Sequence, residues 1–138
     1  RILPLTATTL LALALAASSR ADSTYEQRKS ASPDGTVSIE NPGGATRVIG
    51  WDRNEILVRG TLGRGAEGVE FDVSGGGARI EVESSFNPMG AKADLEISVR
   101  AASRLTVESF QGAITVTGVR GTVSAETVNG SIRVGRAS

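Results

Sequence analysis

The sequence contains neither cysteine nor histidine among its 138 residues. Without cysteine the chain cannot form disulfide bonds, use a thiolate nucleophile or carry the modified cysteine of a bacterial lipid anchor. Without histidine it lacks the commonest general base and metal ligand, so histidine-dependent serine triads and Cys/His zinc sites are excluded. We therefore expect a protein that is not an enzyme and that uses neither a cofactor nor a metal ion.

A net charge is also lacking, because 15 lysines and arginines balance 15 aspartates and glutamates. A chain without a strong field of either sign predicts no affinity for nucleic acid or for anionic membrane surfaces. Long apolar runs are confined to the N-terminus, and no later segment places apolar residues at helical spacing.

The first 21 residues have the pattern of a signal peptide. Arg1 precedes an apolar run that ends at Ala17, and small residues lead to a cleavage site between Ala21 and Asp22. The run is too short for a membrane-spanning helix, which needs about 20 apolar residues. A buried N-terminal helix is the alternative, but the polar segment that follows at once favours export.

Export determines the expected organisation of the remaining chain. We expect residues 1–21 to be removed, residues 22–34 to form a flexible N-terminus and residues 35–138 to form one β domain. The mature chain then has 13 basic and 15 acidic residues and no transmembrane segment. It is expected in the periplasm or on the surface of a bacterium.

From Gly35 onward, apolar and polar residues alternate, and 17 glycines punctuate the whole chain. Alternation with period two is typical of a sheet with one buried and one solvated face, so the sequence predicts an all-β domain. Residues 75–77 are three glycines between two alternating segments, which predicts a hairpin. Residues 41–44 and 52–54 predict a turn and a corner.

An eighteen-residue repeat is the most informative pattern. Residues 105–116 align with residues 123–134, and the apolar positions are kept. They are Leu105, Val107, Phe110, Ile114, Val116 and Val119 in the first copy, and Val123, Ala125, Val128, Ile132, Val134 and Ala137 in the second. Such a period predicts a β-solenoid, a β-helix-like stack of rungs of about 18 residues.

The repeat also has predicted limits. The pairs Ile80/Val82, Ile97/Val99, Ile114/Val116 and Ile132/Val134 have nearly constant spacing and predict one continuous sheet face. For residues 35–94, an antiparallel meander fits equally well. The pattern reaches Ser138 without a polar capping segment, so we expect a domain that is incomplete at the C-terminus or an edge covered by strand pairing with a partner.

Two glutamates occupy equivalent positions of the repeat. Glu108 and Glu126 are expected side by side on an outer face, as a solvated ladder balanced by nearby arginines (Arg104, Arg120 and Arg133). A divalent cation that bridges the two carboxylates is the alternative interpretation, although the Gly-Gly-x-Gly-x-Asp motif of calcium-binding repeats is absent.

Three further residues are candidates for surface binding. Gln111 and Asn129 each precede a glycine at a predicted repeat corner, where left-handed backbone geometry is expected. Trp51, the sole tryptophan, lies beside a turn. It is interpreted as a half-buried lid over the first rung, with a sugar-stacking platform as the alternative.

Several segments together resemble one protein family. They are Gly-Thr-Val-Ser-Ile-Glu-Asn at 35–41, Gly-Trp-Asp at 50–52 leading into Glu-Ile-Leu-Val at 55–58, Ala-Asp-Leu-Glu-Ile-Ser-Val at 93–99, Ser-Arg-Leu-Thr-Val at 103–107 and Glu-Thr-Val-Asn-Gly-Ser-Ile at 126–132. Over nearly all of residues 35–138, the chain resembles the bacterial putative-adhesin family. Arg100 departs from the pattern, because members commonly have proline there.

The resemblance implies an exported β-solenoid domain of unknown function, usually within a longer chain, and it transfers no catalytic or ligand-binding residue. We expect a non-enzymatic, adhesin-like envelope or surface protein whose repetitive β surface binds envelope glycans or proteins. Two alternatives remain: a polysaccharide-degrading enzyme on a parallel β-helix, and a scaffold or sensor component of an envelope signalling system.

Overall fold

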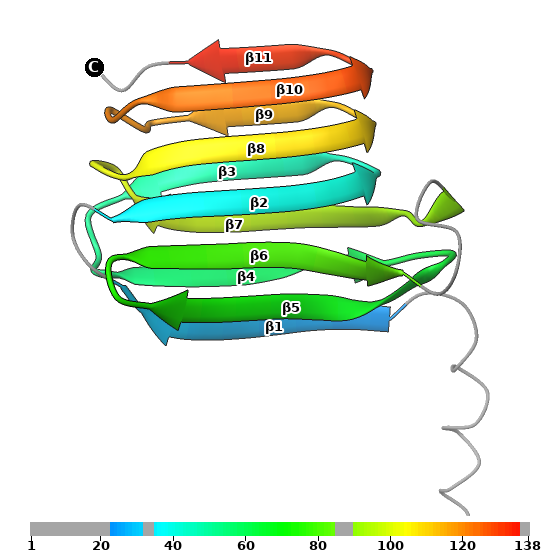
Figure 1. Cartoon of the computed structure of the whole chain (residues 1–138), viewed down its shortest axis with the longest axis horizontal. Helices are drawn as coiled ribbons and strands as arrows, with labels where there is room; N and C mark the ends of the chain where they lie inside the picture. The colour runs from blue at the N-terminus through cyan, green and yellow to red at the C-terminus, as the bar shows by residue number, and fades with distance from the viewer. Residues whose placement is uncertain (1–22, 32–34, 85–89, 136–138) are drawn as a thin grey trace, which may run out of the picture.

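The computed structural model describes residues 23–31, 35–84 and 90–135 and shows an all-β protein (Figure 1). The predicted signal peptide at residues 1–21, its cleavage site at Ala21 and Asp22, and residues 32–34 lie outside the described residues. The prediction of a flexible N-terminus at 22–34 is wrong for Ser23–Ser30, which form a strand of the first sheet. Eleven strands form two sheets, each with both parallel and antiparallel pairs.

The six-stranded sheet, here sheet A, has the order β1-β4-β7-β3-β9-β11. Its strands are β1 (Ser23–Ser30), β4 (Glu55–Leu62), β7 (Ala93–Arg100), β3 (Thr46–Trp51), β9 (Ile114–Thr117) and β11 (Ile132–Gly135). The five-stranded sheet, here sheet B, has the order β10-β8-β2-β6-β5. Its strands are β10 (Val123–Asn129), β8 (Arg104–Gln111), β2 (Thr36–Gly43), β6 (Gly77–Ser84) and β5 (Ala66–Ser74).

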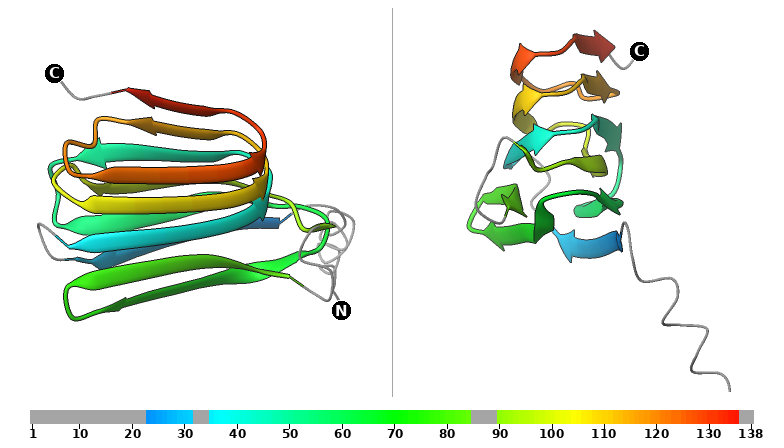
Figure 2. Two further views of the ribbon diagram at one scale, coloured as in Figure 1. Left: turned by 45° about the horizontal axis from the view of Figure 1, so that its top comes forward. Right: turned by 90° about the vertical axis from the view of Figure 1, so that its right-hand side faces the viewer.

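The path of the chain differs from a simple succession of rungs. Strands β2 and β3 lie in the middle of the two sheets, and the chain then runs through β4 and β5 to one end of the stack. It returns through β6 and β7 and crosses to the other side of β2 and β3, where β8 to β11 follow. Figure 2 shows the resulting pair of facing layers.

The eighteen-residue repeat corresponds to the offset between paired residues in two parallel strand pairs. Leu105 of β8 pairs with Val123 of β10, and Ile114 of β9 pairs with Ile132 of β11. Each pair is offset by eighteen residues, as the sequence alignment predicts. The two copies therefore lie directly against each other in both sheets.

The predicted continuous face that includes Ile80 is wrong. Ile80 belongs to β6 of sheet B, whereas the later pairs belong to sheet A. Within sheet A, β3 lies between β7 and β9, so Ile97 is paired with Val48 and is level with Val116 rather than with Ile114. Sequence spacing did not reveal this arrangement, because β3 precedes both β7 and β9 in the sequence and yet lies between them in the sheet.

The predicted meander over residues 35–94 is wrong except for the β5–β6 hairpin, the one antiparallel pair of consecutive strands among the described residues. Antiparallel pairing joins β1 to β4, β4 to β7 and β5 to β6, all toward one end of the stack. The β5–β6 hairpin confirms the predicted turn, and Gly75 has φ of 58° there. Strand β2, by contrast, runs through Gly43, so the turn predicted at 41–44 is found at Gly44 and Ala45.

The core lies between the sheets and is built from the inward positions of the alternating strands. Fully buried side chains include Ile39, Ile56, Ile80, Ile97, Leu105 and Ile114. Asn41 is also buried. Its side-chain amide is satisfied there, because Nδ2 donates to Thr46 Oγ1 over 3.0 Å and to the carbonyl oxygen of Ala93 over 2.9 Å. An inward asparagine can thus continue the strand where the sequence indicated a turn.

The two ends of the stack are built differently. At one end, Lys29 of β1 reaches across to β5, where its Nζ donates to the carbonyl oxygen of Phe71. At the other end, β10 and β11 are the outermost strands among the described residues (Figure 1). Ile132 and Val134 of β11 are exposed there.

Candidate binding surface

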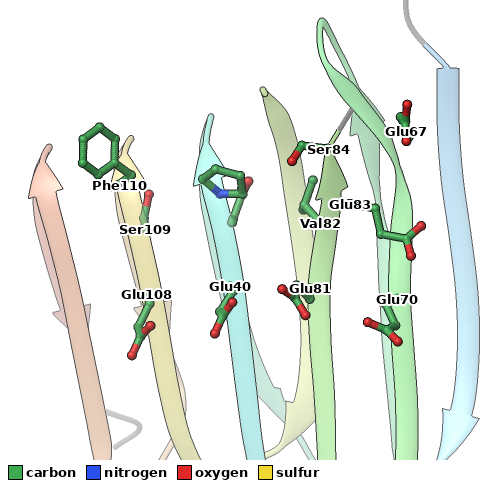
Figure 3. Close-up of a pocket in the computed structure, with 12 residues that line it drawn as sticks. Glu40, Glu67, Glu70, Glu81, Val82, Glu83, Ser84, Glu108, Ser109 and Phe110 are labelled. Carbon is green, nitrogen blue, oxygen red and sulfur yellow. The ribbon is translucent and has the colours of Figure 1, made fainter. Parts of the chain in front are cut away.

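Five glutamates form a row across the outer face of sheet B, with one on every strand. The strand registers place them side by side in the order Glu126, Glu108, Glu40, Glu81 and Glu70. Figure 3 shows the part of this row that runs from Glu108 to Glu70. Neighbouring strands lie about 4.8 Å apart, so like charges are brought close along the whole width of the sheet. We call these residues the glutamate row.

A shared local pattern produces the row. In β2, β8 and β10, the glutamate follows an inward residue that packs in or against the core: Ile39, Val107 and Ala125. Because side chains alternate along a strand, the next residue points outward. The same alternation orients Glu81 after Ile80 in β6.

The electrostatics of the row are uneven. Burial raises the pKa of Glu40, and the negative charges of Glu81 and Glu108 raise the pKa further, while Arg79 partly opposes them. Arg79 Nη2 lies 3.0 Å from Glu81 Oε1, the one ion pair that the described residues provide to this row. In the middle of the row, the fold therefore holds the carboxylate of Glu40 close to two other negative charges.

Beside the row lies a second line of outward side chains, which we call the apolar row: Pro42, Phe110 and Val128. The registers on either side of these residues make them neighbours on β2, β8 and β10. Val128 is 67% exposed, the largest value among the exposed large apolar side chains. Pro42 and Phe110 line, with Glu40, Glu81 and Glu108, a groove of about 700 Å³ on this face.

The outer face of sheet A offers a direct comparison. There the pairing registers place Arg59, Glu96 and Arg47 side by side. Arg59 Nη2 lies 3.0 Å from Glu96 Oε1, and Arg47 Nη1 lies 3.9 Å from Glu96 Oε2. Charges alternate across sheet A, so a row of like charges with a single ion pair is a property of sheet B and not of the strand architecture.

Glu108 and Glu126 lie side by side on an outer face, as predicted. The predicted balancing by arginines does not take the form of ion pairs. None of the ion pairs found in residues 23–31, 35–84 and 90–135 joins either glutamate to Arg104, Arg120 or Arg133. Arg133 belongs to β11, on the other sheet.

Gln111 and Asn129 are also brought together, since they are paired at the ends of β8 and β10. Both are exposed. The pairing of the two strands continues into the corner, because the amide of Gly112 donates to the carbonyl oxygen of Asn129 over 3.0 Å. Gly112 has φ of 140°, which agrees with the prediction of unusual backbone geometry at this corner.

Trp51 does not join the other candidates, because it ends β3 in sheet A. Its side chain is half-buried, with Nε1 donating to the carbonyl oxygen of Glu55 over 2.9 Å. The guanidinium of Arg53 lies 5.3 Å from the centre of its ring. The indole therefore closes the corner between β3 and β4, and one of its faces is already covered by a cation.

A polar pair lies beneath the groove. Asn41 and Ser109 are paired across β2 and β8, and both are at least nine-tenths buried. Asn41 Oδ1 and Ser109 Oγ have no hydrogen-bond partner among the described residues. The inner side of this part of sheet B is thus not purely apolar.

The glutamate row differs in geometry from the active site of a glycan-cleaving enzyme. The carboxylates of the row lie next to one another on one face, whereas glycan-cleaving enzymes hold two carboxyl groups across the scissile bond. Within the part of the chain that the structure describes, no three His, Cys, Asp or Glu residues gather closely enough to hold a metal ion. The cation that could bridge Glu108 and Glu126 therefore stays a prediction.

Sequence patterns did not indicate Glu40, Glu81, Glu70 or Pro42, and they grouped Phe110 and Val128 with the inward apolar positions of the repeat, whereas both lie on the outer face. A signal for Glu40 was present, because apolar-Ser/Thr-apolar-Glu occurs at residues 37–40, 105–108 and 123–126. The first occurrence is separated from the second by β3 to β7 and so does not obey the eighteen-residue period. Glu81 and Glu70 carry no such signal, since their positions depend on the β5–β6 hairpin docking beside β2.

Comparison with known proteins gives a fold and no family. No protein-family model and no curated protein matches the chain. A putative lipid binding protein from Parabacteroides distasonis has a similar solved structure, with a TM-score of 0.52 and 11% identity over 84% of this chain and 52% of that one. At this identity the likeness shows the fold alone.

Two other solved structures are less similar. A putative cell adhesion protein from Clostridium sporogenes has a TM-score of 0.46 and 10% identity, covering 82% of this chain and 59% of its own. A putative adhesin from Parabacteroides distasonis has a TM-score of 0.46 and 12% identity, covering 82% and 56%. The chain thus spans between half and three fifths of the length of these structures. The described residues contain no helix long and apolar enough to cross a membrane.

Proposed function

We propose that the protein is a non-enzymatic, adhesin-like surface protein that binds its partner through the outer face of sheet B. The observation that carries this proposal is the combination, on one continuous face, of the glutamate row and the apolar row. The two rows run across the strands side by side, and all their members except Glu126 and Val128 line a shared groove. A partner with cationic groups and apolar contacts, on an envelope protein or glycan, fits such a face.

The glutamate row is expected to lower the stability of sheet B. Like charges placed directly opposite each other on neighbouring strands destabilise a sheet. Sheet A avoids that cost with alternating charges, and sheet B does not. A cationic partner would offset the repulsion, and the exposed apolar row would add contact area that is independent of charge.

Two further elements belong to this proposal. Residues 1–21 are proposed to be a signal peptide cut between Ala21 and Asp22, which would place the protein in the periplasm or at the cell surface. The intact mass of the protein secreted by a bacterial host tests the cut. The stack is proposed to be a β-solenoid, which the in-register parallel pairs β8–β10 and β9–β11 support.

Retention of the full chain on envelope fractions of its source bacterium tests the binding face. Glu40→Gln/Glu108→Gln should weaken retention, whereas Glu26→Gln/Glu96→Gln, with the same charge change on sheet A, should not. Retention by the unaltered chain should also fall as ionic strength rises, because exposed charges are screened beyond about 10 Å at 0.1 M salt. Equal retention of both variants, or turnover of an acidic glycan that Glu108→Gln/Glu126→Gln abolishes, contradicts the proposal.

A further inference from the structure

The inner side of β1 interrupts the apolar lines that cross sheet A. Along one of these lines, the pairing registers place four completely buried side chains next to one another: Val116, Val48, Ile97 and Val58. The next position in the line is Gln27 of β1, which is exposed. The inner positions on either side of it are Tyr25 and Lys29, both half-buried. Strand β1 thus places polar groups where the other strands place aliphatic side chains.

Contacts hold these three side chains across the end of the core. Tyr25 packs against the core, and its hydroxyl donates to Gln27 Oε1 over 2.8 Å. Lys29 Nζ donates to the carbonyl oxygen of Phe71 on β5 and lies 5.1 Å from the centre of the phenyl ring. Phe71 is only 5% exposed, although β5 is the outermost strand of sheet B. We call Tyr25, Gln27 and Lys29 the edge cap.

Strand β5, the other outermost strand at this end, is protected in a different way. Its pairing with β6 shifts register between Ala66 and Gly68. Its outward side chains include Glu70 and Asp72, both exposed. Bulges, charged side chains and inward-pointing charges are the means by which natural sheets avoid pairing edge to edge. Both strand edges at this end therefore carry such a feature.

We propose that the edge cap keeps this end of the stack closed to a second copy of the chain, so that copies do not associate end to end through β1 and β5. A stack of strands with an open end exposes unpaired backbone groups, and terminal units with a polar face keep repeat proteins soluble. A second copy is the occupant that fits this end, because its own β1 and β5 present two edges at the same separation. The inference goes beyond the proposed function and does not rest on it.

Replacement of the cap by apolar residues should open this end. In the variant Gln27→Val/Lys29→Val, the line that ends at Val58 continues to the edge, and the inward charge is removed. We expect the variant to self-associate with an association constant higher by about tenfold or more for each valine, since burial of one valine side chain is worth at least that factor.

The full chain, produced by secretion from a bacterial host, serves for the measurement. Sedimentation velocity over a range of concentrations gives the association constants. Amide hydrogen exchange locates the contact, because half of the amides of an edge strand point away from its neighbour and exchange freely. In the variant, these amides of β1 and β5 should become protected as concentration rises, whereas in the unaltered protein they should not.

A matched control lies on the other face of the same strand. Thr24→Val/Arg28→Val also replaces one polar and one charged side chain of β1, but at outward positions, and should leave the exchange of the β1 edge unchanged. Glu40→Gln/Glu108→Gln, which tests the proposed function, should leave it unchanged as well.

Gln27→Val alone guards against loss of the fold, because it keeps the contact between Lys29 and Phe71. It should show a smaller increase in association, with the strand content of the unaltered protein in circular dichroism. A folded Gln27→Val that does not associate, equal association of Thr24→Val/Arg28→Val through the β1 edge, or concentration-dependent protection of β1 in the unaltered protein overturns the proposal.

Discussion

Lys29 and Phe71 tie the two sheets together at one end of the stack. Lys29 Nζ donates to the carbonyl oxygen of Phe71 over 2.6 Å, and the same ammonium lies 5.1 Å from the centre of the phenyl ring. Strand β1 is the edge of sheet A and β5 the edge of sheet B, so the contact joins two outermost strands. This end is closed by a charge that finds both a carbonyl oxygen and an aromatic face.

Replacement of this lysine should therefore weaken the fold. We expect Lys29→Ala to lower the free energy of unfolding by about 1–3 kcal/mol, because a hydrogen bond from a charged donor and a cation–π contact are lost together. Arg28→Ala on the same strand is the matched control. It removes an exposed ion pair to Glu55 at 3.6 Å and should cost less than about 1 kcal/mol. Urea denaturation measures both, and equal effects would contradict a special role for Lys29.

The buried polar pair beneath the groove gives a second prediction with opposite signs. Asn41→Ala removes two hydrogen bonds and leaves the carbonyl oxygen of Ala93 without that donor, so we expect a loss of about 1–3 kcal/mol. Ser109→Ala removes a hydroxyl that has no partner among the described residues. It should be neutral or stabilise by up to about 1 kcal/mol.

Thermal and urea unfolding of the two variants provide the measurement. A destabilising Ser109→Ala would show that the hydroxyl has a partner that the described residues do not supply.

Much of the local structure was predictable from the sequence, and the order of the strands was not. Alternation predicted strands, and the repeat predicted that Leu105 pairs with Val123, because an inner position must stay apolar whichever strand lies beside it. The neighbour of Ile97 depends on β3 being inserted between β7 and β9. Alternation is the same for every strand in a sheet, so it carries no information on which strands are neighbours.

The same distinction applies to the candidate surface. Glu108 and Glu126 were found because they lie one repeat apart, and Glu40 was missed because the strands β3 to β7 intervene before β8. The turn predicted at residues 41–44 lies at Gly44 and Ala45 for a related reason. The side chain of Asn41 is satisfied by Ala93, which is 52 residues away in sequence and cannot be anticipated from local pattern.

A glycine at the repeat corner supplies a third prediction. Gly112 has φ of 140°, and a Cβ at this position would collide with the carbonyl oxygen of Gly44. We expect Gly112→Ala to lower the free energy of unfolding by about 1–3 kcal/mol, since both backbone geometry and space exclude a side chain. Gly76→Ala is the control, because no atom lies within 4 Å of the place that its Cβ would occupy and its φ is not in the left-handed region. Differential scanning calorimetry should show a lower Tm for the first variant alone.

The glutamate row makes the fold sensitive to pH through Glu40. Burial, followed by the charges of Glu81 and Glu108, raises the pKa of Glu40 in the folded state above its ordinary value. Above the raised pKa the ionised carboxylate destabilises the folded state. Below the ordinary value Glu40 is protonated whether folded or unfolded, and the penalty is absent. The contribution of this group to stability therefore falls as pH rises between the two values.

Glu40→Gln should accordingly stabilise the protein at neutral pH, by a few tenths of a kcal/mol to about 1 kcal/mol, because repulsion from two neighbouring carboxylates is removed. The gain should shrink as pH falls through the raised pKa of Glu40 and vanish below its ordinary value. Glu26→Gln, on the opposite sheet beside Arg59, removes an attraction instead and should not stabilise at any pH. Urea midpoints of the three proteins across this pH range measure the difference. A pH-independent gain in Glu40→Gln would mean that its neighbours in the row do not act on Glu40 by charge.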